Sequence, residues 1–240
     1  MGLMSDDTAV VVFADLVGFT ALTDAHGDAD AVVVADRLLV LAEEALVDGV
    51  EVVKTIGDAV MLRGDEIEPT LRTVERLVEA VHAEPRFPGV RVGMHVGSVI
   101  VRPGDLFGHT VNVAARLAGV AKAGEVVASR SVVASAGTGF VAHPLGLLDL
   151  RNVADPIEAF NLRPIDPWVT KADVDPVCRM RLDPEESHAT RAYAGSVYVF
   201  CSERCAARFD RDPDRNVDGP FRGTSEDAEP GEGPTRGPST

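Results

Sequence analysis

The hydrophobic positions of the first 160 residues alternate between strand-like and helix-like patterns. The β-branched run Thr8–Ala14 predicts a central strand, because strands buried on both faces read as continuous apolar segments. Residues 21–47 then follow a helical pattern that is broken near Gly27. Residues 66–82 and 109–120 predict two further helices, the first with its apolar side chains at helical spacing.

Two apolar segments predict paired strands. Residues 50–62 read VEVVKTIGDAVML, in which Gly57-Asp58 separates two apolar runs, a pattern typical of a hairpin. Residues 90–101 predict a second strand pair with Gly97-Ser98 between its strands, and short strands and turns follow to residue 162. This mixture predicts an α/β (α+β) fold with a largely antiparallel sheet and helices covering one face.

The C-terminal third has a different composition. It holds all three cysteines of the chain, an odd number that fits metal or redox chemistry better than a disulfide framework. We expect a main domain over residues 1–163, a proline-rich linker over 164–174 and a small second unit over 175–217. Residues 218–240 predict a disordered tail that is rich in Gly, Pro, Ser, Thr and Glu.

Charge and hydropathy restrict the classes of function. The net charge of −15 argues against a nucleic-acid-binding protein, which needs a basic surface. It does not argue against a nucleotide substrate, because bound divalent cations supply local positive charge. The sequence has no apolar run long enough to cross a bilayer and no N-terminal secretion signal, so no membrane insertion and a cytoplasmic location are expected.

A strand that ends in an aspartate and leads through a glycine turn into a helix suits a metal-bridged phosphate. Asp15, followed by Gly18-Phe19-Thr20, has this form, since backbone N–H groups at a helix start face phosphate oxygens. Asp58, at the tip of the predicted hairpin, supplies a second carboxylate. Two carboxylates that bind two divalent ions meet the requirement for in-line attack at phosphorus. Asp15 alone fits a helix N-cap equally well.

Further polar residues are candidates for the same site. Asn112 and Arg116 are four residues apart in a predicted helix and share a face, where the arginine can neutralise charge at phosphorus and the asparagine can orient a ribose. Lys54 lies within an apolar strand, and Asp105 lies in a loop seven residues before Asn112. Simpler explanations exist for some of these residues. Asn112 and Arg116 could belong to a solvated helix face, and Lys54 could be a surface lysine on a strand.

Three segments resemble the signature blocks of the class III nucleotidyl cyclases, in the family's order. They are FADLVGFT at 13–20, VKTIGDAVM at 53–61 and RPGDLFGHTVNVAAR at 102–116, and the similarity extends over residues 8–163. The resemblance implies a ferredoxin-like catalytic domain. It also implies two Mg²⁺ or Mn²⁺ ions, held by Asp15, Asp58 and the backbone carbonyl of Leu16.

The same resemblance assigns roles around the nucleotide. Lys54 and Asp105 match the residues that contact the purine, and Asn112 and Arg116 match the pair that acts on the transition state. Arg151, in LDLRNVADP, matches a basic residue that touches the triphosphate, where lysine followed by glycine is more usual in the family.

Hydrogen-bonding patterns distinguish the two purines. Adenine offers an acceptor at N1 and a donor at its 6-amino group, which complement a lysine donor and an aspartate acceptor. Guanine offers the opposite pattern on this edge, so Lys54 and Asp105 predict ATP as substrate.

A homodimer is expected as well. Lys54 and Asp58 are four residues apart across a turn but must reach opposite ends of one ATP. The family solves this problem by packing two chains head to tail, so that each site takes residues from both chains.

The second unit resembles a YHS domain, a small module associated with metal-handling proteins. DPVCRM at 175–180 and YAGSVYVFCSERCAARF at 193–209 carry the similarity, although Arg179 follows the first cysteine where glycine is usual. Cys201 and Cys205 are four apart and could share a helix face, with Cys178 folded alongside. Three thiolates suit Zn²⁺ or Cu⁺ with a fourth position left to solvent, His188 or a partner, but three reduced cysteines that fill a small core fit equally well.

The sequence therefore predicts an adenylate cyclase that converts ATP to 3′,5′-cyclic AMP and pyrophosphate at a homodimer interface. Its C-terminal module would adjust activity in response to a metal or to redox state. Two alternatives stay open, a guanylate cyclase and a catalytically idle dimerisation scaffold that presents the metal-binding module.

Overall fold

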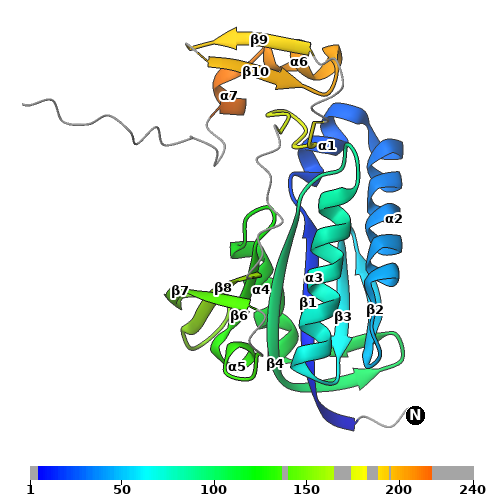
Figure 1. Cartoon of the computed structure of the whole chain (residues 1–240), viewed down its shortest axis with the longest axis vertical. Coiled ribbons are helices and arrows are strands. Elements are labelled where there is room, and N and C mark those ends of the chain that lie inside the picture. The colour runs from blue at the N-terminus through cyan, green and yellow to red at the C-terminus, as the bar shows by residue number, and fades with distance from the viewer. Residues whose placement is uncertain (1–4, 137–139, 165–173, 183–188, 195, 218–240) are drawn as a thin grey trace, which may run out of the picture.

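The computed structural model describes residues 5–136, 140–164, 174–182, 189–194 and 196–217 (Figure 1). Residues 165–173 of the predicted linker, the tail from 218 onward and His188 lie outside these residues. The main unit contains the elements β1 (Ser5–Leu16), α1 (Phe19–His26), α2 (Asp28–Ala45), β2 (Val50–Ile56), β3 (Ala59–Gly64), α3 (Ile67–Ala83), β4 (Val90–Arg102), β5 (Asp105–Phe107), α4 (His109–Val120), β6 (Val126–Ser129), α5 (Arg130–Val133), β7 (Phe140–Leu148) and β8 (Ile157–Pro164).

These strands form one sheet of eight in the order β2-β3-β1-β4-β6-β8-β7, with β5 paired to β4. All pairings are antiparallel except that of β4 with β6, so the prediction of a largely antiparallel sheet is confirmed. The apolar run around Thr8–Ala14 is the central strand β1, between β3 and β4, and the Gly57-Asp58 hairpin joins β2 to β3.

The prediction of two strands within residues 90–101 is wrong. These residues form the single long strand β4, which pairs with β1 along twelve positions from Val90 to Val101. Gly97 marks a close approach and not a turn, because a Cβ on it would lie 2.7 Å from Oγ1 of Thr110 in α4. The chain reverses later, at residues 103–104, where β4 meets β5.

Helices cover both faces of the sheet, whereas the sequence predicted one. Helices α2 and α3 pack on the face that holds Val10, Val12 and Ala14 of β1 (Figure 1). Helix α4 packs on the opposite face, where its Ala114 and Ala118 contact the alternate side chains of β1. Successive side chains of a strand point to opposite faces, so the continuous apolar run of β1 serves both layers.

Helix α4 lies directly on strand β4 at Gly93, where an added Cβ would overlap the backbone N of Ala118 and the carbonyl O of Ala114. Gly93→Ala should therefore push α4 off the sheet and lower the free energy of unfolding by about 2 kcal/mol, as measured by urea denaturation. Gly119→Ala on the same helix is the matched control, because a Cβ there meets no heavy atom within 4 Å. That control should leave stability unchanged or raise it, since alanine favours helix.

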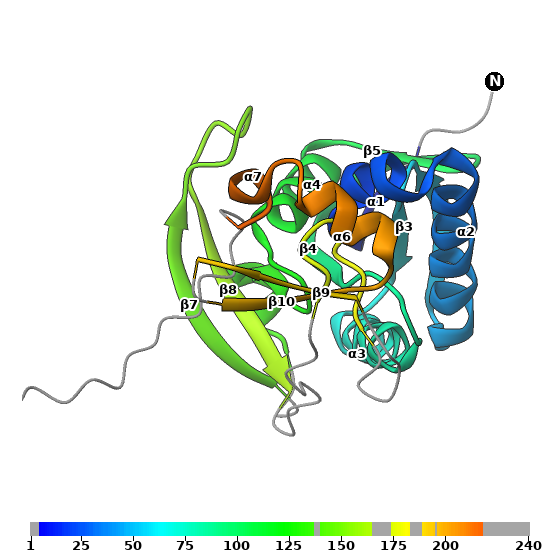
Figure 2. The ribbon, with the colours of Figure 1, turned by 90° about the horizontal axis from the view of Figure 1, so that it is seen from above.

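The C-terminal unit contains β9 (Ala189–Tyr193), β10 (Ser196–Phe200), α6 (Glu203–Phe209) and α7 (Pro213–Val217). The two strands form a separate antiparallel hairpin. This unit lies over the end of the main domain that carries α1 (Figures 1 and 2). Its Phe200 and Phe209 share a buried cluster with Leu22 and Ala25 of α1, so the two units pack through one apolar interface.

None of the helices within the described ranges combines the length and apolarity that crossing a membrane requires.

Candidate active site

The two predicted metal-binding carboxylates lie next to each other. Asp15 is near the end of β1, opposite Ala59 of β3, so Asp58 at the hairpin turn comes beside it. The N–H of Leu16 donates to the carbonyl of Asp58 at 3.4 Å and ties the hairpin tip to the end of β1. Strand pairing therefore brings together two aspartates that are 43 residues apart in the sequence.

Arg91 is a third member of this group that the sequence analysis missed. It lies directly opposite Asp15 in the antiparallel pairing of β1 with β4. Its Nε and Nη2 both donate to Oδ2 of Asp15, at 2.7 and 2.5 Å. Only the register of β1 against β4 reveals this neighbour, because the two residues are 76 apart in the chain.

The proximity of the carboxylates changes the acidity of Asp58. Burial raises the pKa of Asp58 above its ordinary value, and the negative charge of Asp15 raises it further, while Arg91 acts in the opposite direction. Even with the guanidinium of Arg91 on Asp15, the pair resists carrying two negative charges. A divalent ion would offset this repulsion, and its binding should weaken as the pH falls toward the pKa of Asp58, because protons then compete for the carboxylate.

The predicted phosphate turn joins β1 to α1. Gly18 has φ +80°, a conformation that favours glycine, and the N–H of Leu22 donates to its carbonyl at 2.9 Å. Phe19 begins α1, and its partly buried side chain packs against two apolar clusters. Thr20 is exposed in the first turn of the helix. The backbone groups there are those expected to face phosphate.

Lys54 and Asp105 form an ion pair with Nζ 2.6 Å from Oδ1. Lys54 comes from β2, and Asp105 begins β5, which the sequence analysis had placed in a loop. The hydrogen bond from Lys54 lowers the pKa of Asp105, and so does the N–H of Leu106. A donor and an acceptor thus lie side by side at a half-exposed position, where a planar base edge could bind both.

Asn112 and Arg116 are exposed on α4, one turn apart. The Nε of Arg116 donates to the backbone carbonyl of Arg151 at 3.2 Å. Leu150 packs against the buried face of α4, which places exposed Arg151 beside Arg116. The structure therefore brings the guanidinium of Arg116 to the backbone of Arg151.

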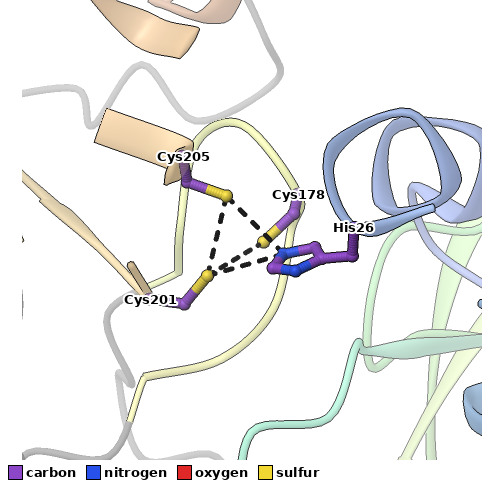
Figure 3. A group of neighbouring side chains, drawn as sticks. All are labelled: His26, Cys178, Cys201 and Cys205. Atoms are coloured by element: carbon purple, nitrogen blue, oxygen red, sulfur yellow. Dashed lines mark hydrogen bonds between the residues drawn. The ribbon is translucent and has the colours of Figure 1, made fainter. Parts of the chain in front are cut away.

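A second side-chain cluster contains the three cysteines and a histidine from the main unit (Figure 3). The ligand atoms of Cys178, Cys201, Cys205 and His26 lie within 4.8 Å of one another. Cys201 lies before α6, whose N-cap is Ser202. The prediction that Cys201 and Cys205 share a helix face is therefore wrong. His26, in the last turn of α1, was missed because no sequence pattern links it to cysteines more than 150 residues away.

The donor sets of the two clusters suit different metals. Carboxylate oxygens at Asp15 and Asp58 suit Mg²⁺ or Mn²⁺. Asp15 already pairs with a cation, the guanidinium of Arg91. Thiolates with an imidazole nitrogen suit a softer ion.

The family comparisons agree with this geometry. Residues 3–163 match the family model described as the adenylate and guanylate cyclase catalytic domain, and residues 174–218 match the YHS domain model. The fold and the site thus define a nucleotidyl cyclase catalytic domain that is followed by a YHS domain. The chain belongs to the adenylate and guanylate cyclase catalytic domain family, whose fold implies the use of divalent metals.

Curated relatives are named as adenylate cyclases. A pH-sensitive adenylate cyclase of Mycobacterium tuberculosis is 40% identical over 158 residues, which are 64% of this chain and 40% of the relative. An adenylate cyclase of Streptomyces griseus is 36% identical over 119 residues, 49% of this chain and 30% of the relative. The chain thus spans well under half the length of these relatives.

Solved structures share the fold. An adenylyl cyclase of P. aeruginosa has a TM-score of 0.58 at 17% identity, over 70% of this chain and 100% of that one. An adenylate cyclase of Trypanosoma brucei, described in its monomeric state, has a TM-score of 0.59 at 23% identity, over 75% of this chain and 94% of that one.

Proposed function

We propose that this protein is an adenylate cyclase that converts ATP to 3′,5′-cyclic AMP and pyrophosphate at the interface of a homodimer. The observation that carries the proposal is the pairing of Lys54 with Asp105 beside helix α4, together with the separate Asp15–Asp58 group. The names of the curated relatives support the same activity.

In the reaction, the ribose 3′-oxygen forms a bond to the α-phosphorus, pyrophosphate leaves and the hydroxyl proton passes to solvent. Asp15, Asp58 and the carbonyl of Leu16 would hold Mg²⁺ or Mn²⁺. When bound, these ions lower the pKa of the 3′-hydroxyl and neutralise phosphate charge.

The remaining residues bind and orient the nucleotide. Lys54 would donate to adenine N1 and Asp105 would accept from the 6-amino group, exchanging their present ion pair for contacts with the base. Arg116 would stabilise charge at phosphorus and Asn112 would orient the ribose, while Arg151, whose backbone carbonyl accepts from Arg116, would contact the triphosphate. The turn at Gly18, Phe19 and Thr20 would contribute backbone N–H groups.

The arrangement of these groups within one chain supports the dimer. Asp58 has Asp15 and Arg91 as electrostatic partners, whereas Lys54, on the same hairpin, has Asp105. Each chain thus contributes its carboxylates to one site and its base-binding pair to the other. A two-fold axis would join these contributions into two equivalent complete sites.

An assay of the purified 240-residue chain with Mn-ATP and with Mn-GTP, reading out cyclic product, tests the function. Cyclic AMP should form from ATP, and Asp58→Asn should lower that rate by about 10³-fold or more, because the metal loses a ligand. Cyclic GMP as the main product would establish a guanylate cyclase instead. A folded dimer that yields neither product would indicate the catalytically idle scaffold that presents the metal-binding module.

A further inference from the structure

The cluster of His26 with the three cysteines joins two parts of the chain that are far apart in sequence (Figure 3). His26 ends α1 of the cyclase domain, and the cysteines come from the YHS domain. We propose that these four residues form a Zn²⁺ site that fixes the YHS domain to helix α1. This inference stands on the cluster itself and does not require the chain to be an active cyclase.

The spacing of the ligand atoms fits a tetrahedral ion. A tetrahedral site with Zn–S bonds of about 2.3 Å has sulfur atoms about 3.8 Å apart, and with Zn–N of about 2.05 Å its sulfur–nitrogen edges are about 3.6 Å. Sγ of Cys201 lies 3.6 Å from Sγ of both Cys178 and Cys205. Nε2 of His26 lies 3.6 Å from Sγ of Cys201 and of Cys205. Three thiolates and one imidazole form a closed Zn²⁺ set.

The polypeptide around the cysteines is held by a carboxylate. Asp175 is completely buried, and it accepts hydrogen bonds from the N–H groups of Val177, Cys178 and Cys201, at 2.7, 3.2 and 2.8 Å. One side chain therefore positions two of the three cysteine backbones. Such support of the ligands is typical of metal sites.

Other contacts orient His26 toward the cysteines. Leu22 lies one turn before His26 on the same face of α1, and Leu22 and Ala25 are buried against the YHS domain. Nη1 of Arg208 donates to the carbonyl of Asp24 at 2.7 Å. The histidine thus comes from a helix that already packs on the module, and metal binding would need little rearrangement.

The site also connects to the phosphate turn. Arg179 directly follows Cys178, and its side chain packs on Gly18, where an added Cβ would lie 2.5 Å from Cγ of Arg179. Gly18 precedes α1, whose other end carries His26. A metal that binds both Cys178 and His26 would therefore hold Arg179 against the turn between Asp15 and α1.

Zn²⁺ titration of the reduced 240-residue chain against a chromophoric chelator tests the site. We expect one Zn²⁺ per chain. His26→Ala should weaken Zn²⁺ affinity by about 10- to 100-fold, because even the loss of a residue that hydrogen-bonds to a metal ligand weakens binding by that factor. His26→Cys should restore tight binding, because four thiolates also bind Zn²⁺. His143→Ala removes an exposed histidine of β7 and is the matched control.

Hydrogen exchange provides a second readout that is independent of catalysis. Zn²⁺ should slow exchange at the backbone amides of α1 in the wild-type chain and in His26→Cys, but much less in His26→Ala. Equal Zn²⁺ affinity and equal α1 protection with and without His26 would overturn the shared site. A reduced wild-type chain that binds Cu⁺ but no Zn²⁺, or neither ion, would overturn it as well.

Discussion

Mixing Asp15→Asn chains with Lys54→Met chains is expected to restore about a quarter of the wild-type cyclase activity, although each variant alone is inactive. Random pairing makes about half of the dimers mixed, and each mixed dimer has one intact site of two. The intact site takes its carboxylates from the Lys54→Met chain and its base-binding pair from the other. Both substitutions keep the size of the side chain, so the fold should survive.

The geometry provides a matched negative control for this mixture. Asp15 and Asp58 belong to one cluster and therefore to one side of each shared site. Every site of an Asp15→Asn and Asp58→Asn mixed dimer lacks one carboxylate, so this mixture should stay inactive. Activity in that control, or none in the first mixture despite dimers seen by analytical ultracentrifugation, would contradict a site shared between two chains.

The second large effect concerns the choice of base. Lys54→Glu combined with Asp105→Asn should lower the preference for ATP over GTP by about 10³-fold, as measured by kcat/KM for both nucleotides. The first change supplies an acceptor for guanine N1–H, and the second supplies an amide donor for O6. A site whose polar groups face unmatched partners loses orders of magnitude in rate.

Lys122→Gln controls for the net loss of one positive charge, because it neutralises an exposed lysine beyond the end of α4. It should leave the ratio of the two nucleotides unchanged. If the double variant loses activity toward ATP and GTP in parallel, Lys54 and Asp105 do not select the base.

Local patterns predicted most elements of the fold. The hairpin at Gly57-Asp58 and the helix over 109–120 follow from turn residues and apolar spacing, which act within a few residues. Gly97 was misread because a glycine within a strand marks either a turn or a close approach, and only the position of α4 decides between them.

The motifs predicted groups of residues that the structure places near one another. The aspartates and the Lys54–Asp105 pair lie in recognisable segments, and the structure places the members of each pair together. Arg91 and His26 lie outside those segments. Arg91 reaches Asp15 through strand register, and His26 reaches the cysteines through packing between two units. Neither relation leaves a local trace in the sequence.

The apolar face of α1 has a consequence for how this chain can be divided. Leu22 and Ala25 are 1% and 2% exposed because Phe200 and Phe209 cover them. A catalytic fragment that ends near residue 163 would present this face to water and invite self-association. The catalytic domain and the C-terminal unit therefore share one hydrophobic cluster, and a chain that contains both is the natural unit for enzymology.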